Sequence, residues 1–291
     1  MHTKLIIMKH ITNRYVFYVY LFTKHYLIYY NNSKQFEIGG IMNKVEIKNL
    51  SLKKDDILIY DKLNLSIVGN SYTTIIGPSS SGKTILFNTI IKGNKKIKIN
   101  GNIHYVVTNP DKLILGKTVS SQIKFFMEMN NYTKRVISTR FKNIVSFFNL
   151  ESILDKDPYK LSLGEKQLVV LCSIMVLDLD ILMLDNALCR MSKKTKELVL
   201  KYFAKLKKKK VTIVNFASDV SEIIGSDYTI LVDKKLVFNK KTKEVIKDNK
   251  LFEDNNLRLP FLLDITNKLK YYDLIEGKVG SIDELVDKLW K

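Results

Sequence analysis

The sequence predicts an α/β fold in which short buried strands alternate with helices around a phosphate-binding loop. Three observations lead to this prediction. Gly77 to Thr84 match the P-loop pattern. Helical segments with one apolar face lie between short apolar runs, an alternation typical of a sheet covered on both faces. The runs with the length and composition of buried strands are Tyr72 to Ile76, Ile181 to Leu184, Val211 to Phe216 and Tyr228 to Val232.

Residues 1–41 differ in composition from the rest of the chain, being aromatic and basic. A spanning helix needs about 20 consecutive apolar residues, and the run from Tyr15 to Thr23 is too short. The segment is either a membrane-surface element or a translated leader ahead of a true start at Met42. We prefer the second interpretation, because codons for Gly39 and Gly40 can supply a ribosome-binding sequence just before Met42.

The next segments alternate apolar with polar residues, which predicts antiparallel strands over Val45 to Leu52 and Leu63 to Val68. After the P-loop helix, Lys96 to Ile99 and Ile103 to Val107 flank Asn100-Gly101. Because Asn-Gly suits a type I′ turn, this segment is predicted to be a tight hairpin.

The P-loop lies between the strand Tyr72 to Ile76 and a helix whose apolar side begins at Ile85. In this context the loop's backbone N–H groups cradle phosphate oxygens, and the helix N-terminus adds positive potential. Lys83 is expected to reach the β- and γ-phosphates and Thr84 to bind Mg²⁺. The predicted nucleotide-binding residues are Gly77, Pro78, Ser79, Ser80, Ser81, Gly82, Lys83, Thr84 and Ile85.

The second half of the chain predicts helices over residues 118–150 and Leu168 to Leu177, then a strand that ends at Asp185. Ser192 is expected to cap a further helix, whose last turn, Lys207 to Lys210, places cations at the negative end of the helix dipole. We interpret that lysine run as a solvated helix end rather than a nucleic-acid site.

The formal net charge of +19 over 291 residues suggests an anionic neighbour, either nucleic acid or a membrane surface. An A/T-rich coding sequence would produce the same Lys, Ile and Asn bias without any function, and both interpretations stay open. The two cysteines, Cys172 and Cys189, form no disulfide framework or metal-ligand spacing, which fits a reducing compartment.

Two further motifs follow the P-loop in order. Residues Leu161 to Gln167, with the sequence LSLGEKQ, are similar to the LSGGQ signature, and Leu182 to Asp185 are similar to a Walker B strand. The chain therefore resembles the nucleotide-binding domain of ABC (ATP-binding cassette) proteins, from Val45 onward. This resemblance implies a P-loop NTPase fold with a mixed sheet, an antiparallel β subdomain, a helical signature subdomain and a small α-rich C-terminal extension.

The resemblance also implies a composite site. ATP would lie between the P-loop and Walker B of one subunit and the signature of another, with Thr84 and Asp185 at Mg²⁺. The signature residues that would face the partner's ATP are Ser162, Leu163, Gly164 and Glu165. Leu163 departs from the glycine of the family motif and adds a side chain where phosphate must approach.

Several positions of this chain depart from the catalytic pattern of the family. Asn186 follows Asp185, where a glutamate would activate water, and an amide cannot accept that proton. Losing a general base costs about 10²- to 10⁴-fold in rate. We predict that this site binds ATP and turns it over poorly or not at all. The other departures are Thr108 at the Q-loop glutamine, Ser218 at the switch histidine, Ser192 at the D-loop aspartate and Lys54 near the adenine-stacking position.

The tail narrows the resemblance to the energy-coupling-factor branch of the family. The tail contains Leu257 to Pro260, a helix at Phe261 to Tyr271 and a capping-box pattern at Ser281 and Glu284, and Asn109-Pro110-Asp111 near the Q-loop points to the same branch. The resemblance implies three parts: an N-terminal extension (1–41), an ATP-binding domain (42–240) and a C-terminal extension (241–291). It also places the docking groove for a membrane partner near the Q-loop and the helix from Val119 to Met129, although the apolar residues of that helix fit a place in the core equally well.

The function implied is that of an ATP-binding subunit of an importer for a vitamin or metal ion, at the cytoplasmic face of the cell membrane. Its implied partners are a second, catalytically intact ABC ATPase, a transmembrane coupling protein and a substrate-binding membrane component, with no specific nucleic acid. Two alternatives stay open. One is a non-transport ABC protein acting on the ribosome or nucleic acid, and the other is a structural subunit that does not respond to nucleotide.

Overall fold

The computed structural model describes residues 5–11, 14–21, 24–31, 43–255, 257, 261–277, 279 and 282–290, with side chains from Asn43 onward except at 249, 263, 282 and 283. The strands are β1 (Leu5–Ile11), β2 (Arg14–Leu21), β3 (Lys24–Asn31), β4 (Asn43–Lys54), β5 (Ile57–Val68), β6 (Tyr72–Ile76), β7 (Ile97–Ile99), β8 (Ile103–Val106), β9 (Ile181–Asp185), β10 (Thr212–Phe216), β11 (Tyr228–Val232) and β12 (Leu236–Lys241). The α-helices are α1 (Lys83–Lys92), α2 (Val119–Met129), α3 (Lys134–Phe148), α4 (Leu163–Met175), α5 (Lys193–Lys208), α6 (Thr242–Val245), α7 (Asn249–Glu253), α8 (Phe261–Tyr271) and α9 (Ile282–Leu289). Single 3₁₀ turns are η1 (Pro110–Lys112), η2 (Glu151–Ile153), η3 (Pro158–Lys160) and η4 (Val220–Ile223).

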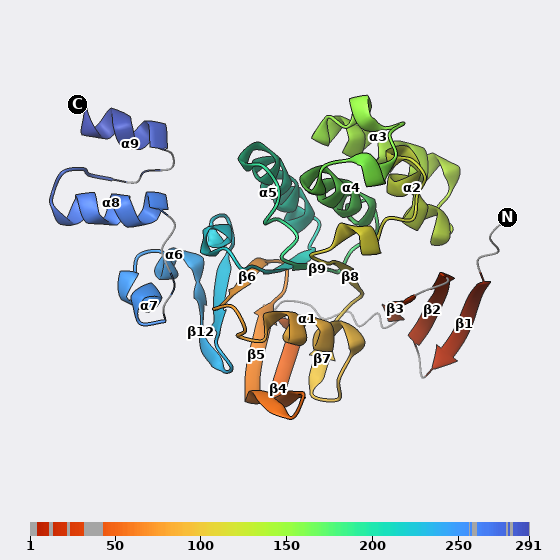
Figure 1. Ribbon diagram of the computed structural model, residues 1–291, viewed down its shortest axis with the longest axis horizontal. Helices are drawn as coiled ribbons and strands as arrows, with labels where there is room; N and C mark the ends of the chain where they lie inside the picture. The colour runs from red at the N-terminus through yellow and green to blue at the C-terminus, as the bar shows by residue number, and fades with distance from the viewer. Residues whose placement is uncertain are drawn as a thin grey trace.

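The central sheet has the strand order β12-β11-β6-β10-β9-β8. The strands β11, β6, β10, β9 and β8 pair in parallel, and the edge strand β12 is antiparallel to β11. In Figure 1 this sheet crosses the middle of the molecule, with α2 to α5 on one side and α1 on the other. The predicted mixed sheet with helices on both faces is therefore confirmed.

Alternate side chains of the sheet serve two separate cores, because successive residues of a strand point to opposite faces. In β9, Ile181 and Met183 pack in the core around α1, whereas Leu182 and Leu184 face the helices on the other side. The buried α1 residues of the first core are Leu86, Phe87 and Ile90. A second, antiparallel sheet in the order β5-β4-β7 closes this core from outside.

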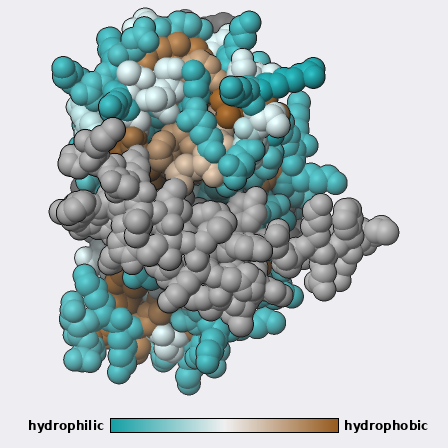
Figure 2. Space-filling model, turned by 90° about the vertical axis from the view of Figure 1, so that its right-hand side faces the viewer, coloured by the Kyte–Doolittle hydropathy of each residue, from teal (hydrophilic) through white to brown (hydrophobic). Residues whose placement is uncertain are grey.

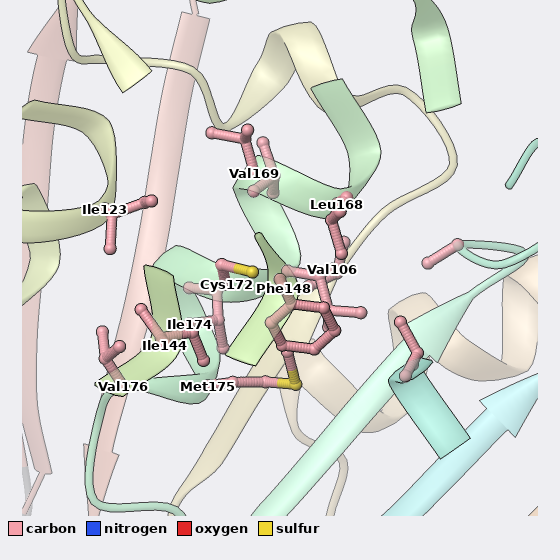
Figure 3. Packing of buried hydrophobic residues seen from close by; sticks show 14 of the residues in the cluster. Val106, Ile123, Ile144, Phe148, Leu168, Val169, Cys172, Ile174, Met175 and Val176 are labelled. Atoms are coloured by element: carbon pink, nitrogen blue, oxygen red, sulfur yellow. The ribbon is translucent and has the colours of Figure 1, made fainter. Parts of the chain in front are cut away.

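The larger core lies between the central sheet and α2 to α5, and Figure 3 shows its side chains around α4. Every residue of α4 from Gln167 to Met175 is buried. A helix that is buried on all sides is apolar all round, which explains why the sequence shows a continuous apolar run here. Burial raises the pKa of the Cys172 thiol, so Cys172 acts as a packing residue.

The antiparallel strands predicted over residues 45–52 and 63–68 are confirmed, since β4 pairs with β5 and places Val45 opposite Ile67. The predicted hairpin at residues 96–107 is wrong. β7 pairs with β4, whereas β8 pairs in parallel with β9, so the two strands belong to different sheets. Asn100 lacks the positive φ that a type I′ turn requires. Gly101, with φ of 127°, instead marks the crossing between the sheets, where the Asn102 N–H donates to Asp180 Oδ2 at 3.0 Å.

The segment predicted as helical over 118–150 contains two helices, α2 and α3, with a break after Met129. Ser192 caps α5 as predicted, because its side chain accepts the Thr195 N–H. The predicted solvated lysine run at the end of α5 is confirmed at Lys208, Lys209 and Lys210, which are exposed, whereas Lys207 is partly buried. Its Nζ lies 2.6 Å from Asp227 Oδ2, an ion pair that links α5 to the turn before β11.

The C-terminal helices begin against the central sheet. Val245 of α6 and Phe252 join Phe238 of β12 in a third apolar cluster. Thr242, at the start of α6, shares a 2.8 Å hydrogen bond with Thr229 of β11. The helix predicted from Phe261 to Tyr271 is present as α8. The predicted capping box at Ser281 and part of the motif at 257–260 lie outside the described residues.

The N-terminal strands form a separate antiparallel sheet in the order β1-β2-β3. Their side chains lie outside the described part of the chain. None of the described helices combines the length and apolar character that crossing a bilayer demands. Seen from the side of α2 and α3, the described surface is mainly hydrophilic, with apolar side chains visible between polar ones (Figure 2).

Candidate nucleotide-binding site

The P-loop joins the end of β6 to α1. At both of its glycines the neighbouring atoms leave no room for a side chain. A Cβ on Gly77 would come within 2.1 Å of the Val232 carbonyl oxygen, at the end of β11. Gly82 is the N-cap of α1 with φ of 89°, and a Cβ there would lie 2.5 Å from Ile59 Cγ2. The intervening residues are Pro78, Ser79, Ser80 and Ser81.

The start of α1 offers a site for an anion. In the described part of the chain no side chain caps this helix, and its first turn holds no acidic residue. The first N–H groups of a helix have no intrahelical partner, so those of Lys83, Thr84 and Ile85 extend from its positive end. A phosphate at this position would accept these hydrogen bonds.

The Lys83 ammonium group lies against the loop itself. Its Nζ donates to the carbonyl oxygens of Gly77 at 2.7 Å and Pro78 at 2.9 Å, and it lies 3.2 Å from Ser81 Oγ. Burial lowers the pKa of this amine, and the Asp185 carboxylate opposes the shift. The loop thus holds a cation beside the helix N-terminus.

Asp185 ends β9 beside the P-loop, where Thr84 Oγ1 lies 3.3 Å from Asp185 Oδ1. The structure therefore brings together the two predicted metal ligands. Burial raises the pKa of the Asp185 carboxyl, and the Thr84 hydroxyl opposes this shift by bonding the charged form. Carboxylate and hydroxyl oxygens are the hard ligands of Mg²⁺ at phosphate sites, so this pair fits a magnesium ion.

Thr108 also reaches Asp185, from the loop after β8. Its Oγ1 donates to the Asp185 backbone carbonyl at 2.9 Å and lies 3.4 Å from Oδ2 of the same residue. The position expected to hold a glutamine thus carries a short hydroxyl that contacts the Asp185 backbone carbonyl and carboxylate. β8 and β9 are neighbours in the sheet, which explains this proximity.

The two remaining predicted catalytic positions are in contact with each other. Asn186 has φ of 54°, a left-handed conformation that asparagine tolerates well. Its N–H donates to the Phe216 carbonyl at 2.7 Å, and its Oδ1 accepts the backbone N–H of Ser218 at 3.3 Å. The amide thus holds the loop after β10. Of the other departures, Ser192 caps α5, and Lys54 lies exposed at the end of β4.

The signature residues lie at the start of α4. Ser162 is the N-cap, and a capping box joins it to Glu165: Oε2 accepts the Ser162 N–H at 2.9 Å and its hydroxyl at 2.6 Å. These bonds lower the pKa of Glu165. Leu163 is 39% exposed, and Gly164 is partly buried. Within the described residues, no hydrogen bond connects this turn to the chain's own P-loop.

Sequence patterns did not reveal two buried polar groups, those of Gln122 and Glu222. Gln122 is fully buried in α2, and its Oε1 accepts the N–H groups of Leu115 and Gly116 at 2.7 and 2.9 Å, which orders the loop before the helix. A signal existed, because Gln122 interrupts the apolar face of the predicted helix. Glu222, in η4, accepts from Asn215 Nδ2 at 2.9 Å and pairs with Lys196 of α5 at 3.4 Å. Its surroundings come from three separated segments, so sequence spacing could not show them.

The family model for ABC transporters matches residues 60–189. This range includes the P-loop, the signature segment and Asp185. The match ends at Cys189, before α5 begins.

Curated relatives resemble most of the chain. The "Energy-coupling factor transporter ATP-binding protein EcfA1" of Mycoplasma capricolum is 30% identical over 272 residues, which cover 85% of this chain and 66% of that protein. Its namesake in Oenococcus oeni is 27% identical and covers 86% of this chain and 98% of the relative. The chain therefore spans about two thirds of the first relative's length and nearly all of the second.

Solved structures show the same fold. The structure of cbiO1 from Clostridium perfringens, described as part of the ABC transporter complex cbiONQ, has a TM-score of 0.63 at 20% identity and covers 77% of this chain and 98% of its own. A nucleotide-free ATP-binding cassette from an ABC transporter has a TM-score of 0.60 at 18% identity, with coverages of 73% and 98%.

Proposed function

The chain contains a domain of the ABC transporter family, and from this premise we propose that it is the ATP-binding subunit of an energy-coupling-factor-type importer. The observation that carries the proposal is the contact of Thr84 with Asp185 beside a P-loop whose lysine is in place. The similarity to energy-coupling factor ATP-binding proteins, over 85% and more of the chain, supports the choice of branch.

ATP is the proposed nucleotide, held by the P-loop and the N-terminus of α1. Lys83 would bind the terminal phosphates, and Thr84 and Asp185 would hold Mg²⁺. The ion supplies charge neutralisation for the phosphate oxygens when it is bound. We propose residues 42–240 as the ATP-binding domain. The C-terminal extension, residues 241–291, begins with helices that pack on the same sheet.

The chain's own site is proposed to bind ATP and hydrolyse it slowly. Asn186 stands where a base would have to accept the proton of water, and a neutral amide cannot do so. Its Oδ1 is engaged with the Ser218 N–H, and Ser218 itself offers no imidazole. Thr108 donates its hydroxyl to the Asp185 carbonyl and has no amide group of the kind a glutamine would supply. Binding without efficient hydrolysis would make this ATP a clamp between subunits.

The signature would then serve a paralogous ATPase that keeps its catalytic glutamate. Ser162 lies at the N-terminus of α4, where the helix dipole favours a phosphate. We place the pair at the cytoplasmic face of the membrane, beneath a transmembrane coupling protein. A separate membrane component would select the substrate, a vitamin or a metal ion. The relative described as part of the cbiONQ complex is consistent with such an assembly.

The test is to purify the tagged full-length chain from its native membranes and to assay whatever is recovered for ATPase activity. We expect a second cassette ATPase that bears the glutamate, together with a multispan membrane protein. Replacing that partner's glutamate should abolish turnover, whereas replacing Asn186 by alanine in this chain should change it little. Recovery of the chain alone, or with RNA, would contradict the proposal. Turnover that survives loss of the partner's glutamate would contradict the assignment of the active site.

A further inference from the structure

Tyr60 of β5 lies directly behind the P-loop. A Cβ on Gly82, the N-cap of α1, would come within 2.8 Å of Tyr60 Cε2 and 3.1 Å of Tyr60 Cζ. Since Cζ carries the hydroxyl, the polar end of the ring lies against the loop. The residue has no exposed surface and belongs to the apolar core around α1.

The Tyr60 hydroxyl is buried without a hydrogen-bond partner among the described residues. Burial raises the pKa of this phenol, and the charge of Asp233 raises it further, so the phenol stays protonated and keeps its donor. Asp233 follows Val232, whose carbonyl oxygen closely approaches Gly77 at the other end of the P-loop. An unpaired buried hydroxyl costs more free energy than one hydrogen bond contributes, and phenylalanine would fill this space without that cost. We therefore looked for a state of the loop in which the hydroxyl has a partner.

The contacts of Lys83 identify such a state. Its ammonium group has three N–H donors, and it contacts three acceptors of the loop: the carbonyl oxygens of Gly77 at 2.7 Å and Pro78 at 2.9 Å, and Ser81 Oγ at 3.2 Å. Binding a phosphate oxygen requires Lys83 to give up at least one of these contacts. A buried carbonyl oxygen that loses its donor needs another one. Tyr60 has a donor to spare beside the same loop.

We propose that Tyr60 is a positioning residue for the P-loop: its hydroxyl donates to a loop carbonyl that Lys83 releases on turning to a phosphate. This inference rests on the proposed function, because it takes the loop to be a phosphate site. It adds an exchange of hydrogen bonds between the free and the nucleotide-bound loop. Tyr60 acts on the loop backbone and not on the nucleotide, and it stabilises the bound arrangement.

The first experiment compares the ATP affinity of the full-length wild type and Tyr60→Phe, with trinitrophenyl-ATP fluorescence as the probe and unlabelled ATP as competitor. We expect Tyr60→Phe to bind ATP about threefold to tenfold more weakly, the effect of losing one hydrogen bond. Without nucleotide, its urea midpoint should equal or exceed that of the wild type, because the variant buries no unpaired hydroxyl. A role in packing alone would not weaken ATP binding while the free protein stays as stable.

Tyr72→Phe is the matched control. Tyr72 of β6 is 2% exposed, and its hydroxyl also has no partner within the described part of the chain. Its ring lies in the core on the helical side of the sheet, with its centroid 5.4 Å from that of Phe203 in α5. Because this hydroxyl lies away from the P-loop, we expect Tyr72→Phe to bind ATP as tightly as the wild type.

A second experiment tests the same hydrogen bond without nucleotide. Lys83→Met frees both loop carbonyls in the free protein, so the Tyr60 hydroxyl should then donate to one of them. Adding Tyr60→Phe should therefore lower the urea midpoint in the Lys83→Met background, although it does not lower the midpoint in the wild-type background. This reversal of sign is specific to a bond between Tyr60 and an acceptor that Lys83 otherwise occupies.

Wild-type ATP affinity in Tyr60→Phe, or an equal loss in Tyr72→Phe, would overturn the inference. So would a lower urea midpoint for Tyr60→Phe alone, since the hydroxyl would then already be paired in the free protein. Failure of the proposed function looks different: the wild type would not bind ATP, or Lys83→Ala would bind it equally well. The role in nucleotide binding would then fall too, and the urea midpoints in the Lys83→Met background would still decide whether Tyr60 reaches the loop carbonyls.

Discussion

The side-chain oxygen of Asn186 accepts the backbone N–H of Ser218 at 3.3 Å, so the residue after Asp185 is joined directly to the loop that follows β10. Both positions depart from the catalytic residues that the family pattern predicts. Their contact has a structural consequence as well as a chemical one. An amide at 186 removes a general base, and it also anchors the loop on which a catalytic histidine would have to lie.

Installing a glutamate at 186 should therefore restore little activity on its own. Asn186→Glu breaks the bond to Ser218 and puts a longer side chain on a left-handed backbone that asparagine tolerates better. We expect ATPase activity to rise by less than the about 10²- to 10⁴-fold that a well-placed base supplies. The double variant Asn186→Glu/Ser218→His should have a higher ATPase activity than the single variant Asn186→Glu. The measurement is ATPase activity of the assembled pair with the partner's own glutamate removed, and full recovery by the single change would refute this account.

The capping serine of α4 should affect the partner's site as well as stability. Removing the Ser162 hydroxyl breaks a capping box and should cost about 1 kcal/mol of unfolding free energy. Thr118→Ala is a matched control, because Thr118 forms the capping box of α2. We expect both variants to lose similar stability in urea titrations and only Ser162→Ala to reduce the ATPase activity of the pair. Equal activity losses would indicate that Ser162 acts through folding alone.

His104 should make stability depend on pH. Burial lowers the pKa of this imidazole from 6.5 to about 4, and its Nδ1 is buried without a partner among the described residues. The unfolded chain therefore binds a proton at a higher pH than the folded chain. The free energy of unfolding therefore has its full value, with respect to His104, above pH 6.5. It decreases as the pH falls toward 4, by up to about 3 kcal/mol.

The check is a set of denaturant titrations between pH 4 and pH 7 for the wild type and for His104→Gln. Carboxyl groups titrate in both proteins, so the difference between the two curves isolates His104. We expect the stability of the wild type relative to His104→Gln to fall as the pH drops from 6.5 toward 4, and to be constant above the ordinary histidine pKa. Parallel curves across the whole range would mean that His104 is protonated alike in the folded and unfolded chains.

The buried carboxylate of Glu222 should make its lysine partner important for folding. Glu222 has a side chain only 2% exposed, and Lys196 approaches it at 3.4 Å. Lys196→Met leaves that carboxylate with Asn215 alone, so we expect a loss of about 1–3 kcal/mol in unfolding free energy. Glu222→Gln keeps a polar partner for Asn215 and should cost less.

A control for this prediction is Lys48→Met. Lys48 also faces a glutamate, Glu46, at 4.0 Å, but its side chain is 81% exposed. Exposed ion pairs contribute little to stability, so the unfolding free energy of Lys48→Met should stay within about 0.5 kcal/mol of the wild type. Similar losses of unfolding free energy in Lys196→Met and Lys48→Met would show that burial of the Glu222 pair does not affect its contribution to stability.

Local sequence patterns were sufficient to predict most of the helices and strands and the P-loop. The strand Tyr72–Ile76, the α1 helix after Gly82, the cap at Ser192 and the helix Phe261–Tyr271 all depend on residues adjacent in sequence. Their hydrophobic period, glycine positions and capping side chains are readable without a partner strand. The placement of Thr84 next to Asp185 was expected from the family resemblance, which put both residues at Mg²⁺, although β10 lies between their strands β6 and β9 in the sheet.

Tertiary pairing decided what the sequence by itself left undetermined. Asn100-Gly101 has the composition of a hairpin turn, yet β7 and β8 join different sheets, β7 beside β4 and β8 beside β9. The contacts Asn186 with Ser218 and Thr108 with Asp185 arise only where the ends of β9, β10 and β8 meet. The sequence determined which residues stand at these ends. Which of them touch depends on strand order, since hydrogen bonds between residues far apart in the chain require the folded sheet to bring them within reach.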